Sequence, residues 1–204
     1  MAEERQTEMR PSPALDTAAK VIRVATVPPL MVAALLLILR ARLGADFADM
    51  TDLGIGWAGL VLLPLLAYPL QMIHPDLRRS GREEQRKLAF LLNLVGYVGC
   101  FIYSLLSGTR PIRRLLTVYF LTVLFLTILN KWAGVRASGH AASAVSPCVF
   151  CAVYSVAGAA VAFGVVCALS VWASLRLERH KPRDIAAGVG AFVLALAVTL
   201  LIYP

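Results

Sequence analysis

The chain has 204 residues, of which 59% are hydrophobic and only 16% are charged. Together with a mean hydropathy of +0.73, this composition excludes an ordinary soluble domain and predicts one integral membrane domain. The net charge of +8 suits an anionic lipid surface, and no soluble basic segment is large enough to hold a duplex. We therefore expect membrane lipids, and no nucleic acid, as partners.

The chain opens with residues 1–20, a mixed-charge segment that we expect to be a solvated cytoplasmic tail, with an interfacial helix as the alternative. Apolar blocks follow, most of them near the ~20 residues that a transmembrane helix needs. Pro28 and Pro29 lie in the first block and predict a kinked first span. In chain order the blocks cover residues 21–39, 55–73, 88–106, 115–129, 141–175 and 185–203.

The block at residues 141–175 contains 35 residues without a charge. As one helix it would be about 52 Å long, against a hydrocarbon core of about 30 Å. A hairpin that turns near residues 156–160 fits better and raises the count from six spans to seven. We therefore predict an all-α polytopic bundle of about seven transmembrane helices, with six as the alternative.

Basic residues give the orientation of these spans. With seven spans, five of the twenty lysines and arginines lie on one face, at Arg40, Arg42, Arg110, Arg113 and Arg114, and fifteen lie on the other. The positive-inside rule places the fifteen, with the N-terminus, in the cytoplasm. Residues 136–140 and 180–184, which hold two of the three histidines, fall on that same face only if the hairpin forms.

These two stretches carry residue types that suit phosphoryl transfer, which needs donors for the phosphate oxygens, a nucleophile and an acid for the leaving group. Arg136 offers a planar guanidinium that matches phosphate. Ser138 and Gly139 open a helix whose free N–H groups can hold an anion. His140, in the first turn, is a candidate acid for the leaving oxygen.

The second stretch supplies a candidate nucleophile. A neutral His180 can attack phosphorus and form a phosphohistidine. Asp184, one helical turn later, can accept the other ring N–H and fix the tautomer. Other interpretations stay open: Asp184 after Pro182 also suits a helix N-terminus, the arginines suit topology alone, and His140 suits an interfacial position.

At these residues the chain resembles the type 2 phosphatidic acid phosphatase (PAP2) superfamily, the metal-independent membrane lipid phosphatases. The second motif of that family, Ser-Gly-His, is present at residues 138–140, and the end of its third motif, His-x-x-x-Asp, is present at residues 180–184. The likeness covers residues 112–204, and residues 172–179 also resemble the corresponding region of bacterial members. Residues 21–107 add N-terminal spans. It implies an integral protein of a bacterial cytoplasmic membrane that works without a cofactor or metal.

By the same resemblance, His180 is the nucleophile, Asp184 its orienting group and His140 the general acid. Two departures accompany the likeness. Ser174 stands where the third motif has an arginine, and the first motif is absent in strict form, with Lys131 and Arg136 as the nearest residues for its role. Arg176 and Arg179 are the candidate replacements for the missing arginine. The expected phosphate-binding set is therefore Lys131, Arg136, Ser138, Gly139 and Arg176.

The expected function is hydrolysis of a lipid-linked phosphate monoester or pyrophosphate, such as phosphatidic acid, phosphatidylglycerophosphate or an isoprenoid (di)phosphate. One alternative is a catalytically degenerate family member that binds anionic lipid headgroups without turnover, because Ser174 replaces the arginine. A small membrane transporter or scaffold is a further alternative, disfavoured because no span carries a charged residue near its middle. The oligomeric state is left open by the sequence.

Overall fold

The structure is a computed structural model that describes residues 12–73 and 81–204, and within them only the backbone of Tyr68, Gln71 and residues 81–87. These described parts are helical and contain no strand. The elements are α1 (Pro13–Ala25), α2 (Pro28–Leu43), η1 (Gly44–Asp46), α3 (Met50–Trp57), the π-helical turn η2 (Ala58–Leu62), α4 (Leu63–Ile73), α6 (Gly81–Leu106), α7 (Arg110–Lys131), α8 (Gly139–Val153), α9 (Ala157–Arg176) and α10 (Pro182–Ile202).

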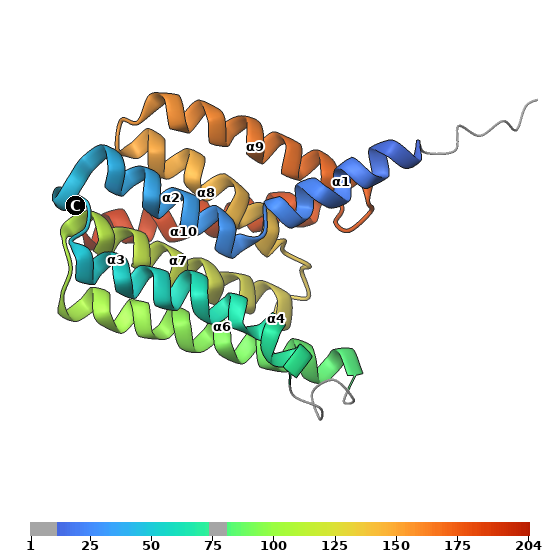
Figure 1. The fold of residues 1–204 in the computed structure, drawn as a ribbon, viewed down its shortest axis with the longest axis horizontal. Coiled ribbons are helices and arrows are strands. Elements are labelled where there is room, and N and C mark those ends of the chain that lie inside the picture. Colours follow the sequence, from blue (N-terminus) through green and yellow to red (C-terminus); the bar gives the residue numbers. More distant parts are fainter. Residues whose placement is uncertain (1–11, 74–80) are drawn as a thin grey trace, which may run out of the picture.

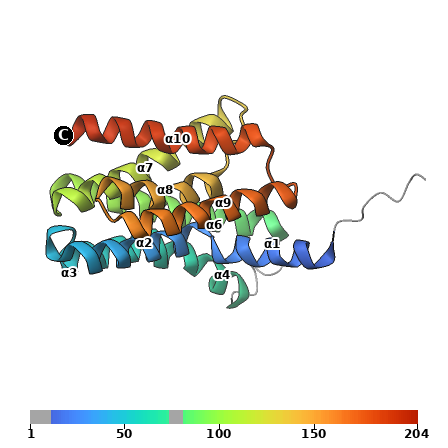
Figure 2. The same cartoon turned by 90° about the horizontal axis from the view of Figure 1, so that it is seen from above.

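The long helices run side by side as one elongated bundle, with the C-terminus at one end (Figure 1). The opposite end carries the α1–α2 junction and the connections α7–α8 and α9–α10 (Figure 1). Helices α8 and α9 pack against each other, α10 packs on α7 and α8, and α1 lies along α9. The view from above shows α10 and α1 on opposite sides of the bundle, with α9 between them (Figure 2).

Six helical segments in the described ranges are long and apolar enough to cross a membrane: Pro28–Asp46, Met50–Ala67, Leu88–Leu106, Arg110–Lys131, Ala157–Arg176 and Pro182–Ile202. The apolar helix α8 is shorter, at 15 residues. Large apolar side chains face outward over the bundle, as Val161 and Leu201 do. The predicted all-α polytopic bundle is confirmed, with six long helices and one short one.

The sequence predicts that the first apolar block forms one kinked span, but the structure has two separate helices there. Helix α1 ends before Thr26 and Val27, and α2 begins at Pro28. Proline lacks an N–H and disfavours helical geometry in the residue before it, but it is tolerated in the first turn of a helix. Two adjacent prolines therefore end one helix and start the next.

The segment before the break also differs from the expected solvated tail. Residues 13–20 belong to α1, which packs along α9 with Ala19 fully buried. Asp16 of α1 accepts a hydrogen bond from Arg176 of α9, with 2.9 Å between Nε and Oδ1. The interfacial-helix alternative is therefore nearer to the structure, and residues 1–11 of the tail lie outside the described residues.

The hairpin predicted near residues 156–160 of the long uncharged block is present, with its turn at Tyr154–Val156. Ser155 adopts a left-handed conformation, with φ of 58°. The N–H of Ser155 donates to the carbonyl of Ala152 and the N–H of Val156 to that of Cys151, which closes α8. Glycine is the usual residue in such a left-handed position, whereas this turn uses serine.

Close helix contacts hold the membrane-spanning part together. Gly59 in η2 faces Gly96 in α6, where a Cβ on Gly96 would lie 3.0 Å from the carbonyl carbon of Gly59. Small residues allow this approach, which is common between helices in membranes. At the bundle end that holds the C-terminus, the buried Asp52 accepts hydrogen bonds from the Tyr103 hydroxyl at 2.8 Å and from the Thr109 N–H at 3.2 Å.

Candidate functional site

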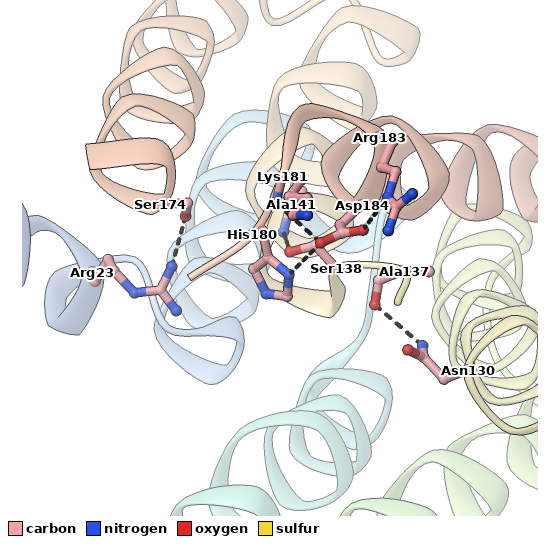
Figure 3. A network of polar contacts seen from close by, with 10 residues as sticks. All are labelled: Arg23, Asn130, Ala137, Ser138, Ala141, Ser174, His180, Lys181, Arg183 and Asp184. Carbon is pink, nitrogen blue, oxygen red and sulfur yellow. Dashed lines mark hydrogen bonds and ion pairs between the residues drawn. The ribbon is translucent and has the colours of Figure 1, made fainter. Parts of the chain in front are cut away.

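The two histidine stretches begin neighbouring helices at the same end of the bundle. Ser138 is the N-cap of α8, and its Oγ accepts a hydrogen bond from the Ala141 N–H at 3.3 Å. The N–H of Ser138 in turn donates to the carbonyl of Asp184 at 2.9 Å. This backbone bond links the start of α8 directly to the first turn of α10 (Figure 3).

Gly188, in the second turn of α10, makes this junction possible. A Cβ at this position would lie 2.9 Å from the carbonyl carbon of Ser138 and closer still to its oxygen. Only glycine lets two backbones approach this closely. The small residue that follows the His-x-x-x-Asp pattern therefore has a physical role, because it allows α10 to pack against the N-cap of α8.

The loop before Ser138 is held by a side chain of α7. Asn130 donates from Nδ2 to the carbonyl of Ala137 at 3.1 Å (Figure 3) and to the carbonyl of Leu126 at 2.7 Å. The side chains of Ala137 and Ser138 are buried, whereas Gly139 is exposed. The first N–H groups of α8 thus lie at an accessible surface, and the first N–H groups of a helix have no intrahelical acceptor.

His180 is placed by the turn that ends α9. Glu178 adopts a left-handed conformation with φ of 51°, and the N–H of Arg179 donates to the carbonyl of Ser174 at 3.0 Å. This reverses the chain and brings His180 beside the start of α10. Its Nδ1 is buried and has no hydrogen-bond partner in the described part of the chain, so Nε2 is the ring nitrogen available to a ligand.

Asp184 lies at the start of α10, beside His180. Its Oδ2 accepts a hydrogen bond from the Lys181 N–H at 3.0 Å, and it lies 3.8 Å from Nδ1 of His180, too far for a hydrogen bond. Asp184 therefore stabilises the first turn of α10, as the N-terminal interpretation predicts, while its carboxylate stays next to the imidazole. Catalytic hydrogen bonds are often long in a free protein and shorten when substrate binds.

His140 contacts the α1–α2 junction. Its Nε2 lies 3.0 Å from Oγ1 of Thr26, which also donates to the carbonyl of Ile22 at 2.8 Å and lies 3.2 Å from Oγ of Ser170. A threonine hydroxyl carries one proton, so when that proton is used on Ile22, the Nε2–H of His140 donates to Thr26. His140 is thereby fixed against α1 and α9.

The cationic residues of the site only partly match the expected set. Arg136 is exposed, and its charge acts on both His180 and Asp184. Arg176 instead faces α1, where it pairs with Asp16. The Lys131 ammonium lies 5.1 Å from the centroid of the Phe90 ring, which directs it toward α6 rather than toward the histidines.

Arg23, which the sequence does not single out, lies beside Ser174, whereas Arg176 points to Asp16. Arg23 of α1 donates from Nη1 to Oγ of Ser174 at 2.6 Å (Figure 3). Thr26, three residues later on the same side of the chain, reaches His140. The available sequence signal is the single arginine inside the apolar run of residues 21–27, but no sequence pattern connects it to a residue 151 positions away.

These charges control the protonation of His180. Burial lowers the pKa of its imidazole below the usual 6.5, the nearby Asp184 carboxylate opposes this effect, and the positive charges of Arg23 and Arg136 add to it. The result is a lowered pKa, so His180 is neutral at pH 7. A neutral imidazole is the form that can act as a nucleophile.

An apolar cavity of about 240 Å³ adjoins the start of α8. Gly139 and Ser143 line it from α8, and the other walls come from the start of α2 and from α6, α7 and α10. The remaining lining residues are Pro28, Phe90, Asn93, Tyr97, Tyr119, Thr122, Val123, Leu126, Ala142 and Phe192. An apolar space thus borders the same turn that presents the N–H groups of α8.

The arrangement can bind an anion beside a neutral imidazole. Within residues 12–73 and 81–204, no group of three or more histidine, cysteine or acidic side chains is placed to hold a metal ion. Comparisons with protein-family models, with curated proteins and with solved structures give no match to this chain.

Proposed function

We propose that this protein is a membrane lipid phosphatase that cleaves a phosphate monoester or pyrophosphate linked to an apolar chain. The observation that carries the proposal is the convergence at one bundle end of His180, His140, Arg23, Arg136 and the N-terminus of α8. The positive charges that act on His180 outnumber the single nearby carboxylate, Asp184. A doubly charged phosphate would balance this excess.

In the proposed reaction, Nε2 of His180 attacks phosphorus while the proton on Nδ1 points toward Asp184. The bond from phosphorus to the leaving oxygen breaks, and that oxygen takes a proton from the imidazolium form of His140, which the negative charge of the bound phosphate favours. Water then attacks the phosphohistidine, His140 takes a proton from the water, and inorganic phosphate leaves. Arg23, Arg136 and the free N–H groups of α8 hold the phosphate oxygens throughout.

The cavity beside Gly139 supports a lipid as substrate. Its surface is mostly apolar, and it shares Gly139 with the proposed phosphate site. A lipid phosphate combines a charged head with an apolar chain, so it fits both features at once. Most basic residues lie at this end, and by the positive-inside rule this favours the cytoplasmic leaflet for the site. The candidate substrates are phosphatidic acid, phosphatidylglycerophosphate and isoprenoid (di)phosphates.

The test is phosphate release from these lipids by the purified protein in detergent with a chelator present. The wild type is compared with His180→Ala, His140→Ala and a control, Arg42→Gln, which removes a charge at the opposite end of the bundle. We expect chelator-resistant release from the wild type and the control, and its loss from both histidine variants. Lipid-phosphate binding without release would instead favour a catalytically degenerate headgroup-binding protein.

A further inference from the structure

Arg23 forms a hydrogen bond with Ser174, the residue that stands where the resemblance calls for an arginine. The distance from Nη1 of Arg23 to Oγ of Ser174 is 2.6 Å. Ser174 is buried, and its own hydroxyl proton goes to the carbonyl of Ser170 at 2.8 Å. Ser174 is therefore an acceptor for Arg23, and only one of the five guanidinium donors is used in this bond.

Helix α1 is fixed so that Arg23 stays in this position. The Asp16–Arg176 ion pair ties the first half of α1 to α9, and Thr26 ties its end to Ser170 and His140. Arg23 lies between these two attachments. Because the helix is attached on both sides of Arg23, its backbone does not have to be ordered when Arg23 binds a ligand.

The surroundings of Arg23 lack a counter-charge. Within the described residues it makes no ion pair with a carboxylate, whereas Arg179 and His140 lie within electrostatic range. Burial and the charge of Arg179 lower the pKa of Arg23, although an arginine keeps its proton at neutral pH. Two positive charges held together without an acid make a site for an anion.

We propose that Arg23 is a phosphate-binding residue and that it supplies, from α1, the guanidinium that position 174 lacks. The inference rests on the proposed function, because it assigns a group to the same phosphate site. Ser174 then acts as a positioning residue that aims Arg23. In this arrangement α1 is part of the site and provides one of its phosphate ligands.

The assignment of Arg23 can be tested by removing its guanidinium and introducing an arginine at position 174. Arg23→Gln removes the guanidinium, the double variant Arg23→Gln with Ser174→Arg restores one at position 174, and Lys20→Gln removes an equal charge from the exposed side of α1. Phosphate release and protection against thermal unfolding by orthovanadate, a phosphate mimic, are measured for all of them. Unfolding without vanadate checks that each variant is folded.

We expect Arg23→Gln to lower kcat/KM by about 100- to 1,000-fold, as for loss of one oxyanion donor, and to abolish protection by vanadate. Lys20→Gln should match the wild type, and the double variant should regain at least tenfold of the loss. Equal activity and protection in Arg23→Gln and Lys20→Gln would overturn the inference while leaving the phosphatase proposal intact. Protection by vanadate that depends on Arg23, in a protein that releases no phosphate, would support Arg23 as an anion ligand and overturn the phosphatase proposal.

Discussion

Replacing Gly188 by alanine tests whether the contact between α10 and the N-cap of α8 builds the site. The added Cβ would lie 2.9 Å from the carbonyl carbon of Ser138, whereas carbon atoms in contact are about 3.5–4.0 Å apart. From this contact alone the two backbones must separate by at least about 0.6–1.1 Å, and the Ser138 oxygen lies closer still to the added Cβ. This moves Ser138 and its helix N-terminus away from Asp184 and His180.

Two effects on stability oppose each other. Alanine favours a helix over glycine by about 1 kcal/mol, and overpacking costs about 1–3 kcal/mol. We expect the free energy of unfolding to fall by about 0–2 kcal/mol. The effect on catalysis is larger, because a misplacement of about 1 Å can cost about 100-fold in rate.

Gly190→Ala is the matched control, since it changes the same residue type in the same helix and its Cβ meets no atom within 4 Å. Both variants are measured by thermal unfolding in detergent and by phosphate release from lipid phosphates. We expect Gly190→Ala to keep or gain stability with wild-type activity, and Gly188→Ala to lose about 100-fold in kcat/KM. If the two variants behave alike in both assays, the contact does not organise the site.

Three further outcomes are expected. Because the pKa of His180 is lowered, its neutral form persists at pH 7, and the acid limb of the kcat/KM profile should lie below about pH 6.5. Arg136→Gln removes a positive charge and raises the pKa of His180, so it should move this limb to higher pH. A limb that stays in place contradicts the electrostatic argument. In a cysteine-free background, single cysteines at Arg183 and Ser155 should react with a membrane-impermeant maleimide from opposite sides of a vesicle, whereas labelling from one side excludes the α8–α9 hairpin as a membrane crossing. Asp52→Ala leaves the Tyr103 hydroxyl without its acceptor and should lower the free energy of unfolding by about 1–3 kcal/mol, measured against exposed Asp46→Ala, which should be neutral.

Length and hydropathy were enough to predict the helical bundle, since a membrane forces apolar segments into helices of limited length. The same argument divided residues 141–175 into two helices, because one helix of that length would not fit the hydrocarbon core. The turn lies at the N-terminal edge of the predicted range, and Ser155, rather than a glycine, takes its left-handed position. Turn chemistry at a single residue depends on packing that a local pattern does not contain.

The sequence by itself determined which chemical groups are available: two histidines, an aspartate and a Ser-Gly turn at segment ends, with basic residues around them. It also determined that both histidine stretches meet at one end, through the parity of the spans. Only the tertiary structure decided which cation serves the site. Arg176 is close to His180 in sequence but pairs with Asp16, and Arg23, which is distant in sequence, reaches Ser174. The physical reason is that helix periodicity fixes only the direction of a side chain from its own axis, whereas the groups that it meets depend on how α1 packs against α9.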